Sequence, residues 1–288
     1  MVELMGRGFS FTEGPRWHEG ALWFSDFYTH RVIRWDGGSF RTVCEVPGQP
    51  SGLGFSPDGD LLVVSMLERR LLRLHAGVLE VVADLAVHFP GPANDMCVDA
   101  AGRAYIGNDG HVNPLQPTVL VRVDPDGTVA VAATDVVTPN GVVLSPNGTL
   151  LLLAESFAGR VSAWDVRPDG SLTNRRVWAN FGVPRLAGTL SEARKQALMI
   201  TDGITLDATG HLWIADAAGS GVWCVAEGGS IVDHVDTGPY TAYSAVLGGD
   251  DGRSLFITAG PALDDIHQDG RDQSVILMAR VDVPGAGF

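Results

Sequence analysis

Residues 140–155 read NGVVLSPNGTLLLLAE: a short apolar run, a turn that ends in glycine, and a second apolar run. Asn-Gly occurs twice in this stretch, at Asn140 and Asn147. Either copy could form a tight turn, because both residue types tolerate positive φ. Two turns would leave only residues 142–145 between them, so we ask whether one asparagine has a different role.

The same unit occurs six times along the chain. The other copies are EGPRWHEGALWFSD, SGLGFSPDGDLLVVS, NDMCVDAAGRAYIGN, DGITLDATGHLWIAD and SAVLGGDDGRSLFIT. The first residues of the six copies are Glu13, Ser51, Asn94, Asn140, Asp202 and Ser244, and the turn glycines are Gly20, Gly59, Gly102, Gly148, Gly210 and Gly252. Further strand patterns follow several copies, which gives about four short strands per unit of roughly 40 residues.

This repeat predicts an all-β fold, a six-bladed β-propeller with four-stranded blades and a central channel. A solenoid is the alternative, although solenoid repeats are usually shorter or more helical. We expect residues 1–288 to form a single domain. We also expect residues 2–9 to close the ring by pairing with residues 275–283.

Composition limits the function classes. The chain has 288 residues and a formal net charge of −14, which argues against nucleic acid or an anionic membrane surface as a partner. No apolar run is long enough for a transmembrane helix and no signal peptide is evident, so we expect a cytoplasmic protein. The three cysteines, Cys44, Cys97 and Cys224, lack metal-site spacing and are expected to be buried free thiols.

The first residue of each copy should lie at one mouth of the channel, because each copy begins the innermost strand of a blade. Glu13, Asn94, Asn140 and Asp202 would bring carboxylate and amide oxygens there, and Ser51 and Ser244 would bring hydroxyls. Each could instead be an ordinary turn residue between blades. Four oxygen ligands at one repeat position favour a divalent cation, and Ca²⁺ before Mg²⁺ because it accepts amide oxygens and irregular geometry.

A second set of polar residues lies 13 to 15 positions after the first residue of each copy and should lie beside the ring. Its members are Asp26, Ser65, Asn108, Glu155, Asp216 and Thr258. His111, in the loop after Asn108, is a further candidate for substrate contact, although an exposed loop histidine is the commoner case.

Residues 183–200 account for the longest spacing between copies. Thr189 and Glu192 resemble a helix capping box, and SEARKQAL is rich in helix-forming residues. The segment is either a surface loop or a lid over one face of the ring.

The stretches FTEGPRW, ANDMCVDAAGRAYIG, TPNGVVLSPNGTLLLLAES and TDGITLDATGHLWIAD resemble the gluconolactonase/senescence-marker-protein (regucalcin-like) family over nearly the whole chain. The resemblance implies a six-bladed propeller with one divalent metal, held by Glu13, Asn140 and Asp202. Asn94 would bind substrate or a water, or complete the metal shell. Asp202 would be the general base in lactone hydrolysis.

Two positions depart from the sugar-lactone pattern. Pro92 stands where such members often have arginine, and residues 108–118 lack the acidic substrate-contacting segment expected there. We therefore expect a metal-dependent lactonase whose small-molecule substrate is less polar than a sugar lactone. Mg²⁺, Mn²⁺, Zn²⁺ and Fe²⁺ remain alternatives to Ca²⁺. The rival functions are phosphotriester hydrolysis at the same metal, a strictosidine-synthase-like condensation, and calcium or ligand binding without turnover. No obligatory protein partner is evident.

Overall fold

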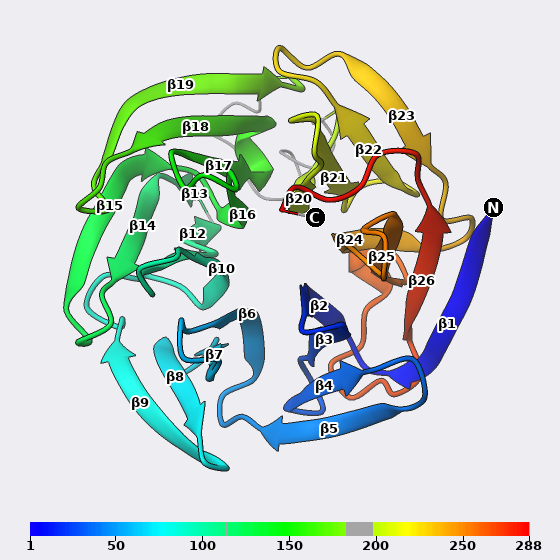
Figure 1. Cartoon of the computed structure of the whole chain (residues 1–288), viewed down its shortest axis with the longest axis horizontal. Coiled ribbons are helices and arrows are strands. Elements are labelled where there is room, and N and C mark those ends of the chain that lie inside the picture. The colour runs from blue at the N-terminus through cyan, green and yellow to red at the C-terminus, as the bar shows by residue number, and fades with distance from the viewer. Residues whose placement is uncertain (113, 183–197, 288) are drawn as a thin grey trace.

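The computed structural model describes residues 1–112, 114–182 and 198–287, and it confirms the six-bladed propeller. Six antiparallel four-stranded sheets are arranged around a central axis (Figure 1). Blades one to three contain β2 (Thr12–His18), β3 (Ala21–Asp26), β4 (Arg31–Trp35) and β5 (Phe40–Glu45); β6 (Pro50–Phe55), β7 (Leu61–Ser65), β8 (Arg70–His75) and β9 (Val78–Asp84); and β10 (Ala93–Val98), β11 (Ala104–Asn108), β14 (Thr118–Val123) and β15 (Val129–Val136).

Blades four to six follow the same order from the axis outward. They contain β16 (Pro139–Leu144), β17 (Leu150–Glu155), β18 (Arg160–Val166) and β19 (Leu172–Asn180); β20 (Thr201–Leu206), β21 (Leu212–Asp216), β22 (Val222–Val225) and β23 (Ile231–Val235); and β24 (Thr241–Gly248), β25 (Ser254–Gly260), β26 (Ser274–Arg280) and β1 (Val2–Phe9). A small hairpin, β12 (His111–Val112) with β13 (Leu115–Gln116), and two short 3₁₀ turns, η1 (Ser156–Ala158) and η2 (Leu263–Asp265), complete the described elements.

The ring closes through its first strand. β1 pairs antiparallel with β26, from Val2 opposite Ala279 to Phe9 opposite Ser274. The sixth blade therefore takes one strand from the N-terminus and three from the C-terminal region, as expected. Strand β26 ends at Arg280, three residues before the end at residue 283 that the sequence predicted.

The two Asn-Gly pairs have different backbone roles. Gly148 has φ +67° and donates to Ser145 O at 2.8 Å, so Asn147-Gly148 is the turn of blade four. Gly141 is not in the left-handed region. A Cβ there would lie 2.4 Å from Asp202 O on the next inner strand. This glycine allows blades four and five to approach closely at the axis.

Apolar side chains fill the spaces between neighbouring blades. One buried cluster lies between blades four and five and includes Trp178, Ile204 and Leu212, and each of the other five inter-blade spaces has a similar cluster. Inner strands β2, β6, β10, β16, β20 and β24 contact one another around the ring. The clusters fix the inner strands in place, so the first residues of those strands are held on a rigid frame.

Candidate active site

The structure places the repeat-initial residues together at one mouth of the channel. Ser51 Oγ donates to Asn94 Oδ1 at 3.1 Å, which joins blades two and three. Asn140, on blade four, and Asp202, on blade five, line the same cavity, and the Asn140 amide lowers the pKa of Asp202. The negative charge of Glu13, on blade one, acts on Asp202 from across the ring. Ser244, on blade six, lies against Gly203.

Asp202 has an unusual environment. Its side chain is buried, and its Oδ1 atom has no hydrogen-bond partner among the described residues. Burial raises the pKa of Asp202 well above its usual range, and the negative charges of Glu13, Asp95 and Asp109 raise it further, whereas the side-chain amide of Asn140 lowers it. An unpaired buried carboxylate oxygen is costly, so this position calls for a cation or a proton.

Asp109 belongs to the same site, although the repeat comparison did not select it. Its N–H donates to Pro92 O at 2.9 Å, and its Oδ1 accepts from Asn94 Nδ2 at 3.1 Å. Burial raises the pKa of Asp109 to about 7, against the hydrogen bond from Asn94. The sequence could have indicated Asp109, because it directly follows Asn108, the polar residue that ends β11 near the mouth.

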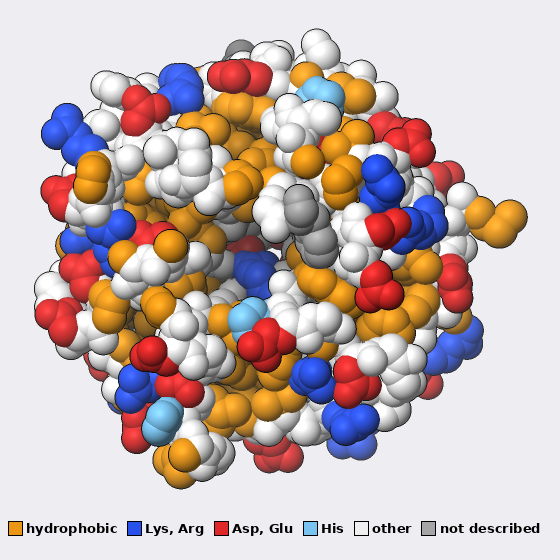
Figure 2. Space-filling view, viewed as in Figure 1, with side chains coloured by type: hydrophobic (Ala, Val, Ile, Leu, Met, Phe, Trp, Pro, Cys, Tyr) orange, Lys and Arg blue, Asp and Glu red, His pale blue; other side chains and the backbone are white. Residues whose placement is uncertain are grey.

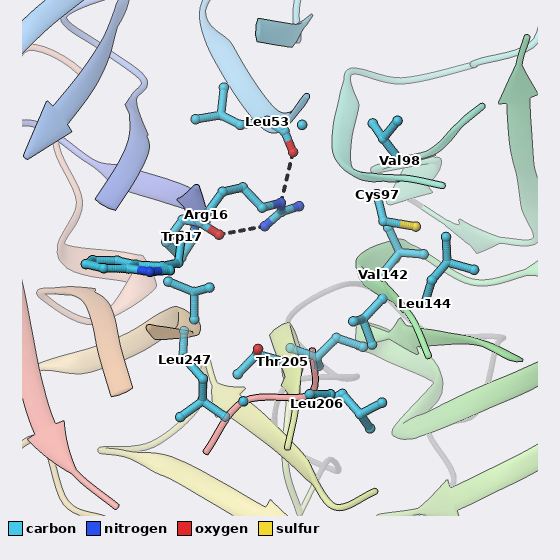
Figure 3. Close-up of a pocket in the computed structure, with 18 of the residues that line it drawn as sticks. Arg16, Trp17, Leu53, Cys97, Val98, Val142, Leu144, Thr205, Leu206 and Leu247 are labelled. Atoms are coloured by element: carbon cyan, nitrogen blue, oxygen red, sulfur yellow. Dashed lines mark hydrogen bonds between the residues drawn. The ribbon is translucent and has the colours of Figure 1, made fainter. Parts of the chain in front are cut away.

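Arg16 and Asp95 lie next to the ring, further along the channel. Arg16 Nη2 is 2.6 Å from Asp95 Oδ1, and Arg16 Nε donates to Leu53 O at 2.9 Å. A bond from Nη1 to Pro15 O, at 2.7 Å, also holds the guanidinium in place (Figure 3). These bonds fix a positive charge beside the buried carboxylates. Repeat comparison could not identify this pair, because no other copy has it.

The site contains more buried acid than nearby base. Glu13, Asp95, Asp109 and Asp202 all have raised pKa values, chiefly because of burial. The pKa of Glu13 reaches about 8 even though the Gly14 N–H and the charge of Arg16 lower it. Carboxylate and amide oxygens around an unpartnered Asp202 Oδ1 form the donor set of a hard divalent cation. The described residues at this mouth therefore suit Ca²⁺ or Mg²⁺.

A cavity of about 390 Å³ opens at this mouth. Asp109, Asn140 and Asp202 form its polar side. Its other walls include Pro92, Phe157, Ile200, Ala217 and Leu263. The last four of these belong to an apolar cluster with Phe11, Phe27, Met66 and Tyr243, drawn from several blades. Thr138 and Ser156 also line the cavity, and their hydroxyls have no hydrogen-bond partner among the described residues. The cavity thus combines an acidic end with walls that are apolar apart from two hydroxyls.

Asp26, Asn108 and Asp216, the polar residues predicted to lie beside the ring, are buried and accept hydrogen bonds from backbone N–H groups. Asp26 Oδ1 accepts from Ser10 N at 2.8 Å, Asn108 Oδ1 accepts from Gly110 N at 2.9 Å, and Asp216 Oδ1 accepts from Ile200 N at 3.1 Å. Each residue ends the second strand of its blade. Their contacts hold the loops that surround the mouth, and a part in substrate binding stays a prediction for all three.

Two other predictions fall on parts that the structure does not describe. His111 begins β12, but its side chain lies outside the described part of the structure. Most of the 183–200 segment, including Thr189 and Glu192, also lies outside the described residues. Ile200, at its end, contributes to the cavity wall. The lid therefore stays a prediction.

The opposite mouth has a different character. A second cavity of about 390 Å³ lies there, lined by Arg16, Leu53, Val98, Leu144 and Leu206 among others (Figure 3). Figure 2 shows this face with a central hollow bordered by hydrophobic side chains. The C-terminal segment reaches its edge, where Ala286 N donates to Leu206 O at 2.9 Å. Because the acidic residues gather at the other mouth, the two ends of the channel are chemically distinct.

The repeat and its ring of polar residues match a known protein family. The SMP-30/Gluconolactonase/LRE-like region model matches residues 11–260, which include all six inner strands. The chain belongs to this family. The resemblance recognised from its motifs is thereby confirmed.

Relatives in the family include named lactonases. The chain is 28% identical to a pentonolactonase of Haloferax volcanii over 85% of this chain and 80% of that protein. It is 26% identical to a 6-deoxy-6-sulfogluconolactonase of Pseudomonas putida over 95% and 92%. The solved structure of regucalcin from Agrobacterium tumefaciens, described as a calcium-binding protein, has a TM-score of 0.77 at 20% identity and covers 99% of this chain and 96% of that one. At that identity the likeness shows the fold alone.

The cysteines form no disulfide. All three are free, with Cys224 buried and Cys44 and Cys97 partly buried, so complete burial holds for only one of them. No helix in the described ranges has the length and apolar character needed to span a membrane.

Proposed function

We propose that this protein is a metal-dependent lactonase that acts on a lactone less polar than a sugar lactone. The observation that carries the proposal is the unpartnered Oδ1 of Asp202, buried among other carboxylates at the end of a cavity in the described part of the chain. Membership in the family and the lactonases among its relatives support the reaction class.

Glu13, Asn140 and Asp202 would hold the cation, and Asn94 would complete the shell or bind substrate. Asn94 is kept in place by Ser51 and Asp109, so its amide has a fixed direction. When bound, a divalent cation would offset the charge of these carboxylates, keep Asp202 ionised and polarise the lactone carbonyl. We expect Ca²⁺ because amide oxygens contribute to the donor set.

Asp202 would act as the general base. A carboxylate has two oxygens, so Asp202 would hold the cation through one and accept a proton from a water molecule in the cavity through the other. The water oxygen forms a bond to the carbonyl carbon, and the ring C–O bond then breaks. The proton held by Asp202 passes to the ring oxygen, which gives a hydroxy acid.

The walls of the cavity support a substrate of low polarity. A polyhydroxylated lactone needs a hydrogen-bonding partner for each buried hydroxyl, and burying one without a partner is costly. Pro92, Phe157, Ile200, Ala217 and Leu263 offer no side-chain hydrogen bonds, whereas Thr138 and Ser156 add two hydroxyls without partners among the described residues. Because the apolar side chains outnumber these hydroxyls, we expect the walls to favour a lactone with mainly aliphatic substituents.

A matched panel tests both parts of the proposal. Lactones of equal ring size, with either alkyl or hydroxyl substituents, would be assayed with chelated protein and after adding back single cations. We expect hydrolysis only with cation and a higher kcat/KM for the alkyl series. Preference for the hydroxylated series would contradict the substrate assignment. Phosphotriesters in the same panel address the rival hydrolase, and cation binding without any turnover would favour a binding protein.

A further inference from the structure

A second group of metal-ligating side chains lies in blade five, on the face opposite the acidic mouth. Asp207 and His211 flank the turn between β20 and β21, and Cys224 lies on β22 (Figure 1). His211 Nδ1 is 3.8 Å from Asp207 Oδ2, and Cys224 Sγ is 4.0 Å from the same oxygen. One ligand atom from each residue lies within 4.8 Å of the other two.

The two oxygens of Asp207 have different surroundings. Oδ1 accepts hydrogen bonds from Thr209 N at 2.8 Å, Thr209 Oγ1 at 2.7 Å and His211 N at 3.0 Å, which fixes the turn. Among the described residues, Oδ2 has only the two long contacts to His211 and Cys224. Since the Asp207 side chain is 1% exposed, water offers this oxygen little compensation. A buried carboxylate oxygen is thus held toward an imidazole and a thiol. His211 Nδ1 also lies 3.1 Å from Thr209 Oγ1, a hydrogen bond that a bound metal would replace.

Blade three shows what the same position contains when it is purely structural. Asp99 has the place of Asp207, and its second oxygen forms an ion pair with Arg103 at 2.6 Å. Arg122 stands opposite Tyr105 there, as Cys224 stands opposite Trp213 in blade five. Blade five therefore keeps the carboxylate but has His211 and Cys224 in place of two arginines. It replaces fixed positive charges with side chains that can bind a metal.

We infer that Asp207 Oδ2, His211 Nδ1 and Cys224 Sγ form a metal site for zinc or a cation of similar chemistry, separate from the acidic mouth. Zinc accepts oxygen, nitrogen and sulfur ligands together, whereas the oxygen donors of the mouth suit harder cations. Tetrahedral zinc at its usual bond lengths places ligand atoms about 3.3–3.7 Å apart. The two contacts of Asp207 Oδ2, at 3.8 and 4.0 Å, are slightly longer than this, and His211 Nδ1 and Cys224 Sγ lie within 4.8 Å of each other, so metal binding requires the side chains to close around the ion.

Access and proton release are consistent with this site. The His211 side chain is 32% exposed, so an ion can enter from that side, whereas Cys224 is buried. A cysteine binds a metal as the thiolate, so metal uptake would release the thiol proton and affinity should rise with pH.

The site also has a structural consequence. Ala208 N donates to Pro284 O at 2.8 Å, and Asp207 forms an isolated bridge with Gly285. A bound ion would tie the β20–β21 turn to β22 while the same turn holds the C-terminal segment. Metal occupancy should therefore raise the stability of blade five and of that segment together.

Cobalt titration of the full-length protein tests this inference without interference from the mouth, whose proposed ligands are all oxygen atoms. We expect a thiolate-to-Co²⁺ charge-transfer band that saturates at one ion per chain and is displaced by Zn²⁺. The band should be absent from Cys224→Ser and at least tenfold weaker in apparent affinity in His211→Ala and Asp207→Asn. It should persist in Cys97→Ser and in Asp202→Asn.

Circular dichroism of each metal-free variant establishes that it is folded, and Asp207→Asn retains an oxygen to accept the turn hydrogen bonds. Absence of a sulfur–cobalt band in the folded wild type would overturn the inference. A band that survives in Cys224→Ser, or that disappears in Cys97→Ser, would overturn it as well.

Discussion

Asn140 and Asp202 lie on neighbouring inner strands of blades four and five and both line the cavity, and the Asn140 amide lowers the pKa of Asp202, whose Oδ1 has no hydrogen-bond partner among the described residues. The amide is a neutral donor and cannot offset the charge of the carboxylates around it. In the metal-free protein, burial therefore favours the protonated forms of these carboxyls, and folding at neutral pH carries the cost of taking up protons or burying charge. Function and stability are therefore expected to conflict at this position.

Asp202→Asn should separate these two effects. We expect turnover to fall by about 10²–10⁴-fold because the general base is lost. The metal-free variant should unfold at a higher temperature than metal-free wild type at neutral pH, because on folding Asp202 must either bury a charge or take up a proton, and the amide does neither. Hydrolysis rates and thermal scans of both proteins measure this. Asp58→Asn, on an exposed turn at the other face, is the matched control and should change neither quantity.

Arg16→Met should destabilise the protein through Asp95. Removing the guanidinium leaves a buried carboxylate without its 2.6 Å partner, a change that costs about 3–5 kcal/mol in buried pairs. The loss should be much smaller in the double variant Arg16→Met/Asp95→Asn, measured by denaturant unfolding. Equal losses in the single and double variants would show that the ion pair is not the cause.

Glu155 should contribute to acid sensitivity. Burial would raise its pKa, but hydrogen bonds from Arg160 and Ser162 and the charge of Arg160 outweigh burial, so the net pKa is lowered from 4.5. Because the folded state favours the ionised form, this stabilisation is present above about pH 4.5 and is lost as the pH falls through the lower, folded-state pKa.

Glu155→Gln should therefore lose about 1.5–3 kcal/mol of unfolding free energy at pH 7 and show a weaker acid dependence than wild type. Unfolding midpoints between about pH 7 and 3 measure this. Glu227→Gln, whose side chain is 66% exposed, is the control and should retain the wild-type profile. Identical acid profiles for wild type and Glu155→Gln would exclude the stated role.

Pro92→Arg should shift substrate preference. Pro92 lies in the cavity wall. In the motif comparison, sugar-lactone members of the family often have arginine at this position. An added guanidinium would supply hydrogen bonds to substrate hydroxyls, so the ratio of kcat/KM for hydroxylated over alkyl lactones should rise by about tenfold or more. Phe157→Leu, which keeps the cavity wall apolar, is the control and should leave the ratio unchanged. Gly91→Ala is not suitable as a control, because a Cβ at residue 91 would clash with Gly110 O.

The sequence predicted the fold and the ring because both depend on a repeat. Equivalent positions in six blades must lie at equivalent heights, so the repeat alone assigns Asn140 to the mouth and Asn147 to a turn. All six turn glycines adopt positive φ, as a hairpin requires.

The unrepeated parts of the site could not be predicted in this way. Asp109 faces the mouth because the chain bends after β11, and Arg16 reaches Asp95 across blades one and three. Such contacts depend on the path of individual loops and on side-chain length, and neither can be derived from the sequence repeat. The same limit applies to Asp207, His211 and Cys224, whose proximity follows from the pairing of β21 with β22.

The most direct test of the central claim is lactone hydrolysis in the Cys224→Ser background, which removes the sulfur ligand of the second site and leaves the mouth unchanged. The protein would be assayed on an alkyl-substituted lactone after exhaustive chelation and again after adding Ca²⁺. We predict that activity disappears with chelation and returns with the cation, and that Asp202→Asn in the same background stays inactive in both states. Full activity in the chelated protein would contradict the account.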